Sequence, residues 1–358
     1  MTTRRHFLAG LLATGLAPRP GWAEAGDPAY LSAARLPSGE FALIGLNRLG
    51  VAVFKIPLPG RGHAAAAHPT TPLAVAFARR PGRFALVVDC LRHAVTAQLD
   101  APEGRHFYGH GAFSGDGRYL FTSENDYDAA RGMVGVWDGR KGFRRVGEFS
   151  SAGVGPHDLR MLPDGETLVV ANGGIETHPE WGRAKLNLPE MRPNLSYLSL
   201  DGTVLEQQEP PAEWHLNSMR HLTVSGDGQV AVACQWQGDP AGTPPLVATH
   251  RRGQSIEFHP MGNGMERDMQ GYVGSVAFAG DGRSLAFTGP REGIAGRMGA
   301  DGQMQARMTA PDICGVAPQG QGFVFTTGVG EVLQETAAHR GQIARHDVAW
   351  DNHLIPVG

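Results

Sequence analysis

Cysteine is scarce in this sequence, and long apolar runs are missing. The 358 residues include 3 cysteines, too few for a disulfide scaffold, and no Cys-x-x-Cys pair occurs. Cys90 and Cys234 each end an apolar, strand-like run, so we expect buried free thiols there. The apolar stretch 10–17 is far shorter than the roughly 20 residues that a transmembrane helix needs. The sequence therefore predicts neither a disulfide framework nor a membrane span.

The common signatures of catalysis are also missing. The sequence has no Gly-x-Ser-x-Gly, no His-Glu-x-x-His, no P-loop and no Cys-x-x-Cys-His haem-attachment motif. The formal net charge is −3 at pH 7, and a mildly acidic, mixed-charge surface argues against nucleic acid as the main partner. No motif therefore assigns a catalytic residue. We expect the protein to be a monomer.

What the N-terminus does contain is an export signal. Arg4 and Arg5 precede Phe7 and Leu8, the apolar stretch follows, and small residues around Ala23 suit a signal peptidase. This pattern predicts a twin-arginine signal peptide over 1–23, export of the folded protein and a periplasmic location. The alternative is an ordinary secretory signal with a chance arginine pair. Export in the folded state allows a cofactor without requiring one.

A weak repeat runs through the rest of the chain, which has 50 glycines and 25 prolines. Four segments read as strand, Asp-Gly turn and strand, and Asp-Gly favours a tight hairpin. They are 111–124, 159–172, 222–235 and 276–289. Three degenerate copies are 36–45, 76–88 and 316–325. Because a four-stranded blade takes roughly 40–50 residues, the copies predict one all-β domain over 24–358, a seven-bladed β-propeller. The alternatives are a β-sandwich and six blades.

Ring closure completes this prediction. We expect the segment 343–350 to pair with the N-terminal strand, because an open ring would leave strand edges exposed. In a propeller the first strand of each blade starts at one mouth of the central channel. The Asp-Gly turns are then structural and lie on the opposite face.

Histidines recur at the predicted start of these first strands. His110, His157 and His221 each precede a turn glycine by a similar spacing, and Ser275 takes the same place in the next blade. Because the innermost strands converge on the axis, we predict a metal site of His110, His157 and His221, for neutral imidazole is a common ligand of Zn, Cu and Fe. The alternative is that each ring binds a neighbouring blade's backbone. His63, His68 and His93 are interpreted as incidental loop residues.

Polar side chains are predicted on the same face, in the loops that follow the second strands. The longest loop, 172–195, interrupts the fourth blade, and long loops on rigid scaffolds often bind ligands. Its basic residues suit a carboxylate or phosphate. The alternatives are turn capping and a packing strut. The predicted ligand-binding residues are Glu124, Asn125, Asp126, Asn172, His178, Arg183, Lys185, Asn187, Arg220 and Gln235.

Several segments resemble a known bacterial family. They are 108–114, 123–126, 154–159, 170–179, 182–187 and 220–222. That family is exported by the twin-arginine route, has no assigned reaction, and is often encoded beside imelysin-type iron-uptake lipoproteins and a dihaem cytochrome-peroxidase-like protein. The resemblance implies a seven-bladed propeller of the quinoprotein amine dehydrogenase-like (YVTN) type. It also implies a role in iron uptake or handling, with imelysin-type proteins as partners.

Three hypotheses follow for function. The first is a periplasmic binding protein whose channel mouth holds a metal (Fe, Cu or Zn) or a small ligand, or docks an iron-uptake partner. The second is a metal-dependent, lactonase-like hydrolase or an oxidoreductase, with Glu124 or Asp126 as the base. The third is an interaction platform whose channel is filled by side chains. Convergence of the histidines distinguishes the first two from the third.

Overall fold

The computed structural model describes residues 20–79 and 83–357. Most of the predicted signal peptide lies outside these residues. Within its predicted cleavage region, Trp22 donates its indole N–H to the His68 carbonyl at 2.9 Å. The propeller begins at Tyr30.

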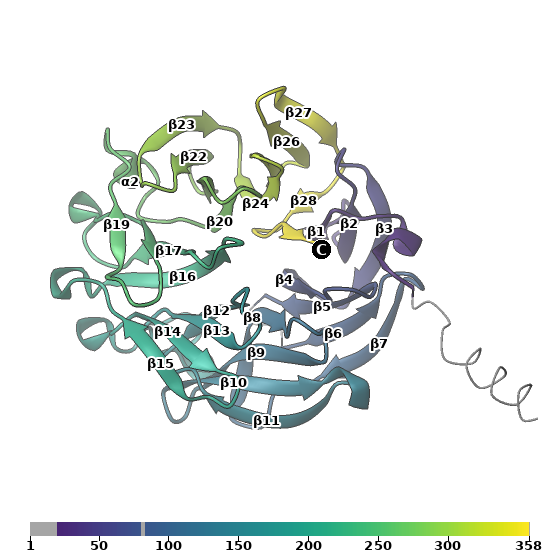
Figure 1. The fold of residues 1–358 in the computed structure, drawn as a ribbon, viewed down its shortest axis with the longest axis horizontal. Coiled ribbons are helices and arrows are strands. Elements are labelled where there is room, and N and C mark those ends of the chain that lie inside the picture. The colour runs from purple at the N-terminus through teal and green to yellow at the C-terminus, as the bar shows by residue number, and fades with distance from the viewer. Residues whose placement is uncertain (1–19, 80–82, 358) are drawn as a thin grey trace, which may run out of the picture.

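Seven antiparallel sheets surround a common axis, as Figure 1 shows. We number them as blades along the chain, and each blade is given from the axis outward. Blade 1 contains β28 (Ala349–Trp350) and β29 (Ile355–Pro356), then β1 (Tyr30–Arg35), β2 (Phe41–Leu46) and β3 (Ala52–Leu58). Blade 2 contains β4 (Gly62–Ala67), β5 (Leu73–Ala78), β6 (Ala85–Asp89) and β7 (Ala94–Leu99). Blade 3 contains β8 (Arg105–Phe113), β9 (Tyr119–Asp126), β10 (Arg131–Asp138) and β11 (Arg144–Ser150).

The remaining blades follow the same order. Blade 4 contains β12 (Pro156–Met161), β13 (Thr167–Asn172), β14 (Asn194–Ser199) and β15 (Val204–Gln208). Blade 5 contains β16 (Asn217–Val224), β17 (Val230–Trp236), β18 (Val247–His250) and β19 (Glu257–His259). Blade 6 contains β20 (Ser275–Phe278), β21 (Ser284–Gly289), β22 (Ile294–Gly299) and β23 (Met304–Thr309). Blade 7 contains β24 (Ile313–Gln319), β25 (Gly322–Thr327), β26 (Glu331–Glu335) and β27 (Arg340–Arg345). The predicted seven-bladed propeller is therefore confirmed.

Helices are single turns in the part of the chain that the structure describes. They are η1 (Trp22–Ala25), η2 (Gly139–Lys141), η3 (Pro179–Trp181), η4 (Leu188–Glu190), η5 (Ala212–Trp214), η6 (Pro240–Gly242) and α2 (Met265–Asp268). None of these described helices is long and apolar enough to cross a bilayer.

The burial pattern of each strand depends on its position in the blade. A second strand such as β13 is buried along its whole length, whereas the outer strand β23 alternates between half-buried and exposed residues. The apolar clusters between neighbouring sheets form the core. At the β8–β9 turn Gly117 has φ +70°, which favours glycine, and Asp116 accepts a hydrogen bond from the Arg118 N–H at 3.0 Å. The Asp-Gly segments thus form the predicted hairpins.

The repeat frame was wrong in blade 2. The segment 76–88 spans the end of β5 and most of β6, the second and third strands, and its Gly82 lies outside the described residues. The innermost hairpin is β4–β5, whose turn has no glycine. Instead, His68 Nδ1 accepts the backbone N–H groups of Thr70 and Thr71 at 3.2 and 3.0 Å. A ring nitrogen takes the place of the usual aspartate, so the turn carries no recognisable signature.

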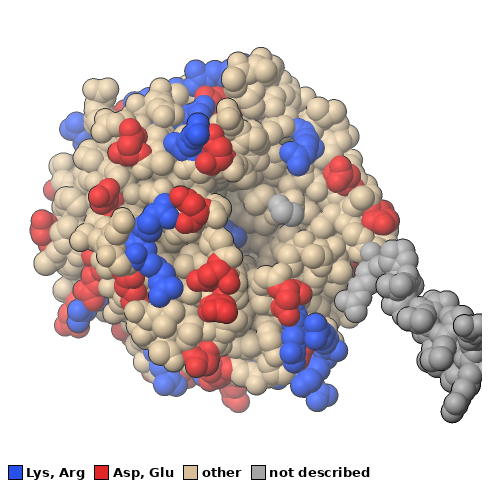
Figure 2. Space-filling model, in the orientation of Figure 1, with Lys and Arg blue, Asp and Glu red and all other residues tan. Residues whose placement is uncertain are grey.

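Ring closure differs in detail from the prediction. Of the segment 343–350, only β28 pairs with β1, while residues 343–345 belong to β27. The later strand β29 also pairs with β1. The C-terminal strands thus form the innermost part of blade 1, and in Figure 1 the C-terminus lies near the axis. Figure 2 shows a hollow around this axis, with acidic and basic side chains mixed around it.

Candidate metal centre

Five histidines converge on the channel axis, one from each of five consecutive blades. His63 lies on β4, His110 on β8, His157 on β12 and His221 on β16, and His353 lies between β28 and β29. Four of them are 7% exposed or less, and His157 is partly buried. We call these five residues the five-histidine centre.

A β-bulge contains three of these histidines, His63, His110 and His157, and a fourth bulge lies directly before His221. The strand register shifts between Gly62 and Ala65, Phe107 and Gly111, Pro156 and Asp158, and Met219 and His221. A bulge leaves a residue out of the ladder and redirects its side chain. In blade 3, Gly109 has φ +98°, and a Cβ there would lie 2.7 Å from the His63 ring, so glycine is required for the close approach.

The rings pack closely. Centroid distances are 4.6 Å for His63–His353, 4.7 Å for His221–His353, 4.6 Å for His157–His221 and 4.9 Å for His63–His110. Two sets of ring nitrogens each lie within 4.8 Å of one another, namely His63/His110/His353 and His110/His157/His221. His110 belongs to both sets.

Two carboxylates stand behind the rings. Asp158 Oδ1 lies 3.2 Å from His110 Nδ1, and Asp351 Oδ1 lies 3.6 Å from His63 Nδ1. A carboxylate in this position favours a proton on Nδ1 and leaves the Nε2 lone pair free for a metal. The two Nε2 atoms, of His63 and His110, face each other at 3.2 Å. Two nitrogens bound to one ion at about 2.0–2.1 Å would be about 3.0–3.4 Å apart, so this spacing fits a shared ion.

Burial favours the neutral form of four of these imidazoles. It lowers the pKa of His63 to about 4, and it lowers the pKa values of His157, His221 and His353 well below the usual range, with further lowering from nearby positive charge. Three further buried ring nitrogens have no hydrogen-bond partner among the described residues. They are His157 Nδ1, His221 Nδ1 and His353 Nε2. Neutral rings with unpartnered nitrogens are the form that binds a metal.

The same burial predicts how the metal-free protein responds to acid. A histidine has a pKa of about 6.5 when unfolded, so the unfolded chain takes up protons that folded His63 refuses. Stability is therefore complete above pH about 6.5 and falls as the pH drops toward 4, by about 3 kcal/mol for His63 alone. Urea unfolding of chelator-treated protein at pH 7.5, 6 and 5 measures this. A His63→Gln variant should show a shallower loss, and equal stability of the unaltered chain at pH 7.5 and 5 would contradict the prediction.

A comparison with known families places the chain. The model of the family described as "Protein of unknown function (DUF1513)" matches residues 56–357. The chain belongs to this family. The matched residues include all five histidines of the centre. A search of curated proteins gave no significant match.

Solved structures similar to this DUF1513 family member show its fold. A chain of hydrazine synthase from Kuenenia stuttgartiensis superposes with a TM-score of 0.62 at 15% identity. The match covers 87% of this chain and 95% of that chain. At this identity the likeness concerns the propeller architecture alone.

The structure brings together the three histidines that the sequence singled out, His110, His157 and His221, and adds two that it did not. His63 is not an incidental loop residue, because it lies on the innermost strand of blade 2. It was missed because the blade 2 turn has no Asp-Gly. His353 was missed because the innermost strand of blade 1 comes from the other end of the chain. Blade 7 has a bulge between Ile313 and Val316 but no histidine in it.

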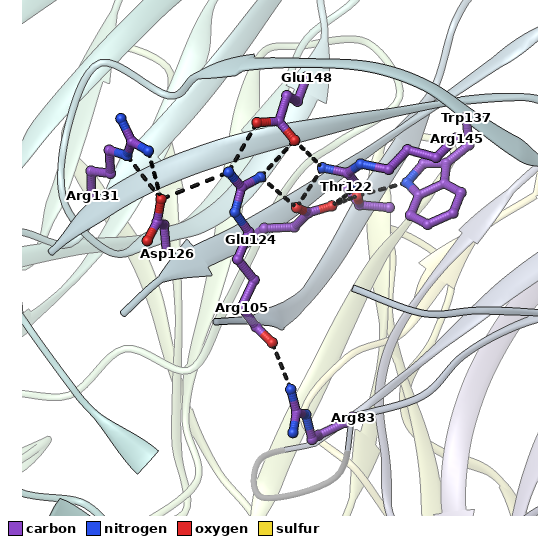
Figure 3. Close-up of polar contacts among 9 residues, drawn as sticks. All are labelled: Arg83, Arg105, Thr122, Glu124, Asp126, Arg131, Trp137, Arg145 and Glu148. Atoms are coloured by element: carbon purple, nitrogen blue, oxygen red, sulfur yellow. Dashed lines mark hydrogen bonds and ion pairs between the residues drawn. The ribbon is translucent and has the colours of Figure 1, made fainter. Parts of the chain in front are cut away.

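Glu124 has a different setting from the one predicted. It has no exposed surface, and its carboxylate accepts two hydrogen bonds from Arg145 at 2.7 and 2.9 Å and one from Thr122 at 2.9 Å (Figure 3). Arg105 lies 3.7 Å away and also binds Glu148 at 2.7 Å. Because its carboxylate is buried and bound to arginine, Glu124 is not a candidate for the predicted base beside the five-histidine centre.

The neighbours of Glu124 are also engaged within the protein. Asp126 accepts a hydrogen bond from Arg131 at 2.9 Å (Figure 3), and Asn125 donates to the Thr177 carbonyl at 3.1 Å. Asn172 is fully buried and donates to the Ser151 carbonyl at 2.8 Å. These predicted ligand residues join neighbouring strands and loops, so their short polar side chains are structural.

The loop 172–195 carries the other predicted ligand residues. His178 accepts the Glu180 N–H and so begins η3, and Asn187 accepts the Glu176 N–H at 2.7 Å. Arg183 and Lys185 are exposed. On blade 5, Arg220 is half-buried beside His221, and the Gln235 carbonyl accepts a hydrogen bond from Gln237. Arg183 and Lys185 thus lie at the surface, Arg220 donates to Ser218 Oγ at 3.1 Å, and His178, Asn187 and Gln235 make local contacts.

Proposed function

We propose that this protein is a periplasmic metal-binding propeller that holds a first-row transition-metal ion in the five-histidine centre. The observation that carries the proposal is the convergence of five imidazoles, with three buried and unpartnered ring nitrogens. Leaving such nitrogens unsatisfied is costly, and a metal satisfies several at once. An all-imidazole set suits Fe, Cu, Zn or Ni and does not suit Mg or Ca.

The geometry supports binding over hydrolysis. A hydrolase needs a base within hydrogen-bond reach of a metal-bound water. The two nearby carboxylates, Asp158 and Asp351, contact the Nδ1 side of His110 and His63 and thus support ligands. Arg160 and His110 hold the pKa of Asp158 low although burial acts to raise it. An accessory role in iron uptake, with imelysin-type partners, is the form of the proposal that agrees with the family resemblance and the predicted export signal.

Metal analysis tests the proposal. Protein purified from periplasm should contain about one metal ion per chain, and a His110→Ala/His157→Ala/His221→Ala variant should contain almost none. His339→Ala is the matched control, because His339 is exposed on blade 7. Iron in the unaltered protein supports the iron-handling form. Equal metal content in the triple variant and the control would overturn the proposal.

A further inference from the structure

The candidate ligands of the five-histidine centre bring no negative charge of their own. Among the residues that the structure describes, both sets of nitrogens within 4.8 Å of one another consist of histidine alone, without a carboxylate or a thiolate. Burial favours the neutral form of four of the five rings. An ion held there gains nitrogen lone pairs but no counter-charge from the atoms that bind it.

The carboxylate behind His63 is neutralised by arginine. Asp351 Oδ1 lies 3.6 Å from His63 Nδ1, and the Asp351 side chain is only 5% exposed. Arg61 Nε donates to Asp351 Oδ2 at 2.6 Å, and Arg79 donates to Oδ1 at 2.9 Å. The backbone N–H of Asn352 also donates to Oδ1, at 2.8 Å. Two guanidinium groups therefore offset the single negative charge that Asp351 places behind the ring.

The carboxylate behind His110 has the same kind of setting. Asp158 Oδ1 lies 3.2 Å from His110 Nδ1, and the Asp158 side chain is 1% exposed. Arg160 lies 3.4 Å from Asp158 Oδ2, which also accepts the Leu222 N–H at 3.0 Å. The side chains of Arg79 and Arg160 are each 28% exposed, so water screens their charges only in part.

The charges on these groups give a positive balance. Two carboxylates face three guanidinium groups in the ion pairs behind the rings, and the imidazoles add nothing while they are neutral. The Born cost of burying an ion rises with the square of its charge, and negative charge nearby is what offsets this cost. In iron–sulfur centres, exchanging thiolate ligands for neutral imidazole raises the reduction potential. A buried site with neutral ligands and a positive surround therefore favours the less highly charged state of an ion.

We propose that the five-histidine centre selects the reduced, less highly charged state of its metal, Fe²⁺ over Fe³⁺ or Cu⁺ over Cu²⁺, and that Arg79 and Arg160 set this selectivity. The selectivity rests on the proposed function, because it concerns the ion that the same histidines hold. The two arginines act on the ion through the carboxylates that they neutralise, without touching it. A ferric or cupric supply then has to be reduced before loading by an external one-electron donor such as a reduced flavin, which loses the electron that the ion gains.

Copper tests the selectivity, because both of its oxidation states can be titrated. Metal-free, full-length protein is titrated with Cu⁺ in the absence of oxygen, in competition with bicinchoninate, and with Cu²⁺ in competition with a chromophoric chelator. We expect Cu⁺ to bind more tightly than Cu²⁺ by about a hundredfold or more. Equal affinities, or tighter binding of Cu²⁺, would overturn the proposal.

An Arg79→Gln/Arg160→Gln variant tests the role of the arginines. It removes one positive charge from behind each carboxylate, so the ratio of Cu⁺ affinity to Cu²⁺ affinity should fall by about tenfold. Arg92→Gln is the matched control, because it breaks an ion pair on the turn between β6 and β7 and should leave the ratio unchanged. The single Arg79→Gln variant should lower the ratio by about threefold, and it serves where the double variant does not fold. An unchanged ratio in the folded variants would show that the arginines do not set the selectivity.

The two proposals fail in different ways. If neither state of copper binds the unaltered protein, the metal centre is overturned and the selectivity with it. If both states bind with equal affinity, and the His110→Ala/His157→Ala/His221→Ala variant binds neither, the metal centre stands and the selectivity alone is overturned.

Discussion

A His110→Ala substitution should weaken metal binding more than any other single change in the five-histidine centre, by at least a thousandfold. His110 belongs to both sets of nitrogens that lie within 4.8 Å, whereas His157 and His353 each belong to one. Without His110 neither set keeps three ligands. Without His353 the set His110/His157/His221 is intact, so we expect about a tenfold loss.

Competition with a chromophoric chelator gives the affinities of the His110→Ala, His157→Ala and His353→Ala variants. His110 is also the partner of Asp158, so the unfolding midpoint of each metal-free variant has to be measured in parallel. A folded His110→Ala variant that binds metal as tightly as the His353→Ala variant would show that the two sets do not share a ligand.

A Glu124→Gln substitution should lower the free energy of unfolding by about 3–5 kcal/mol, the usual cost of removing one member of a buried ion pair. Glu124 has no exposed surface. Among the described residues, Arg145 contacts two carboxylates, those of Glu124 and Glu148. The neutral amide leaves the guanidinium charges of Arg145 and Arg105 partly uncompensated. It also disturbs Thr122, which accepts the Trp137 indole N–H at 3.0 Å (Figure 3).

Glu148→Gln is the matched control for this prediction. Glu148 binds the same two arginines, but its side chain is 38% exposed, so water replaces the lost contacts and the cost should stay below about 1 kcal/mol. Urea unfolding of both variants measures the difference. Similar midpoints for Glu124→Gln and Glu148→Gln would mean that burial does not strengthen this network. Metal content should stay unchanged in both variants, because neither Glu124 nor Glu148 belongs to the two sets of candidate ligands.

The sequence was sufficient for the parts of the fold that local turns determine. Asp-Gly turns at Gly117, Gly165 and Gly228 set the register of blades 3, 4 and 5, and from that register His110, His157 and His221 were placed on the axis. No comparable signal exists where a ring nitrogen of His68 organises the turn. Because blade 2 lacks an Asp-Gly turn, the repeat was placed one strand too late there, and His63 was not predicted to lie on the axis.

Long-range partners explain the remaining differences. The environment of Glu124 depends on Arg105 and Arg145, which come from two other strands of the blade, and no spacing along the chain reveals that contact. An Asp or Glu at the end of a strand has the same local sequence whether it faces a channel or an arginine.

The closure of the ring gives the metal a further effect in the proposed centre. His353 comes from the C-terminal strands of blade 1 and His63 from blade 2, near the other end of the chain, and their rings are 4.6 Å apart. An ion bound by both residues acts as a cross-link between the ends of the chain. Such a link encloses a very long loop, so it removes much conformational freedom from the unfolded chain and resists separation of the closing strands. Loss of the metal should therefore weaken the closure of the ring.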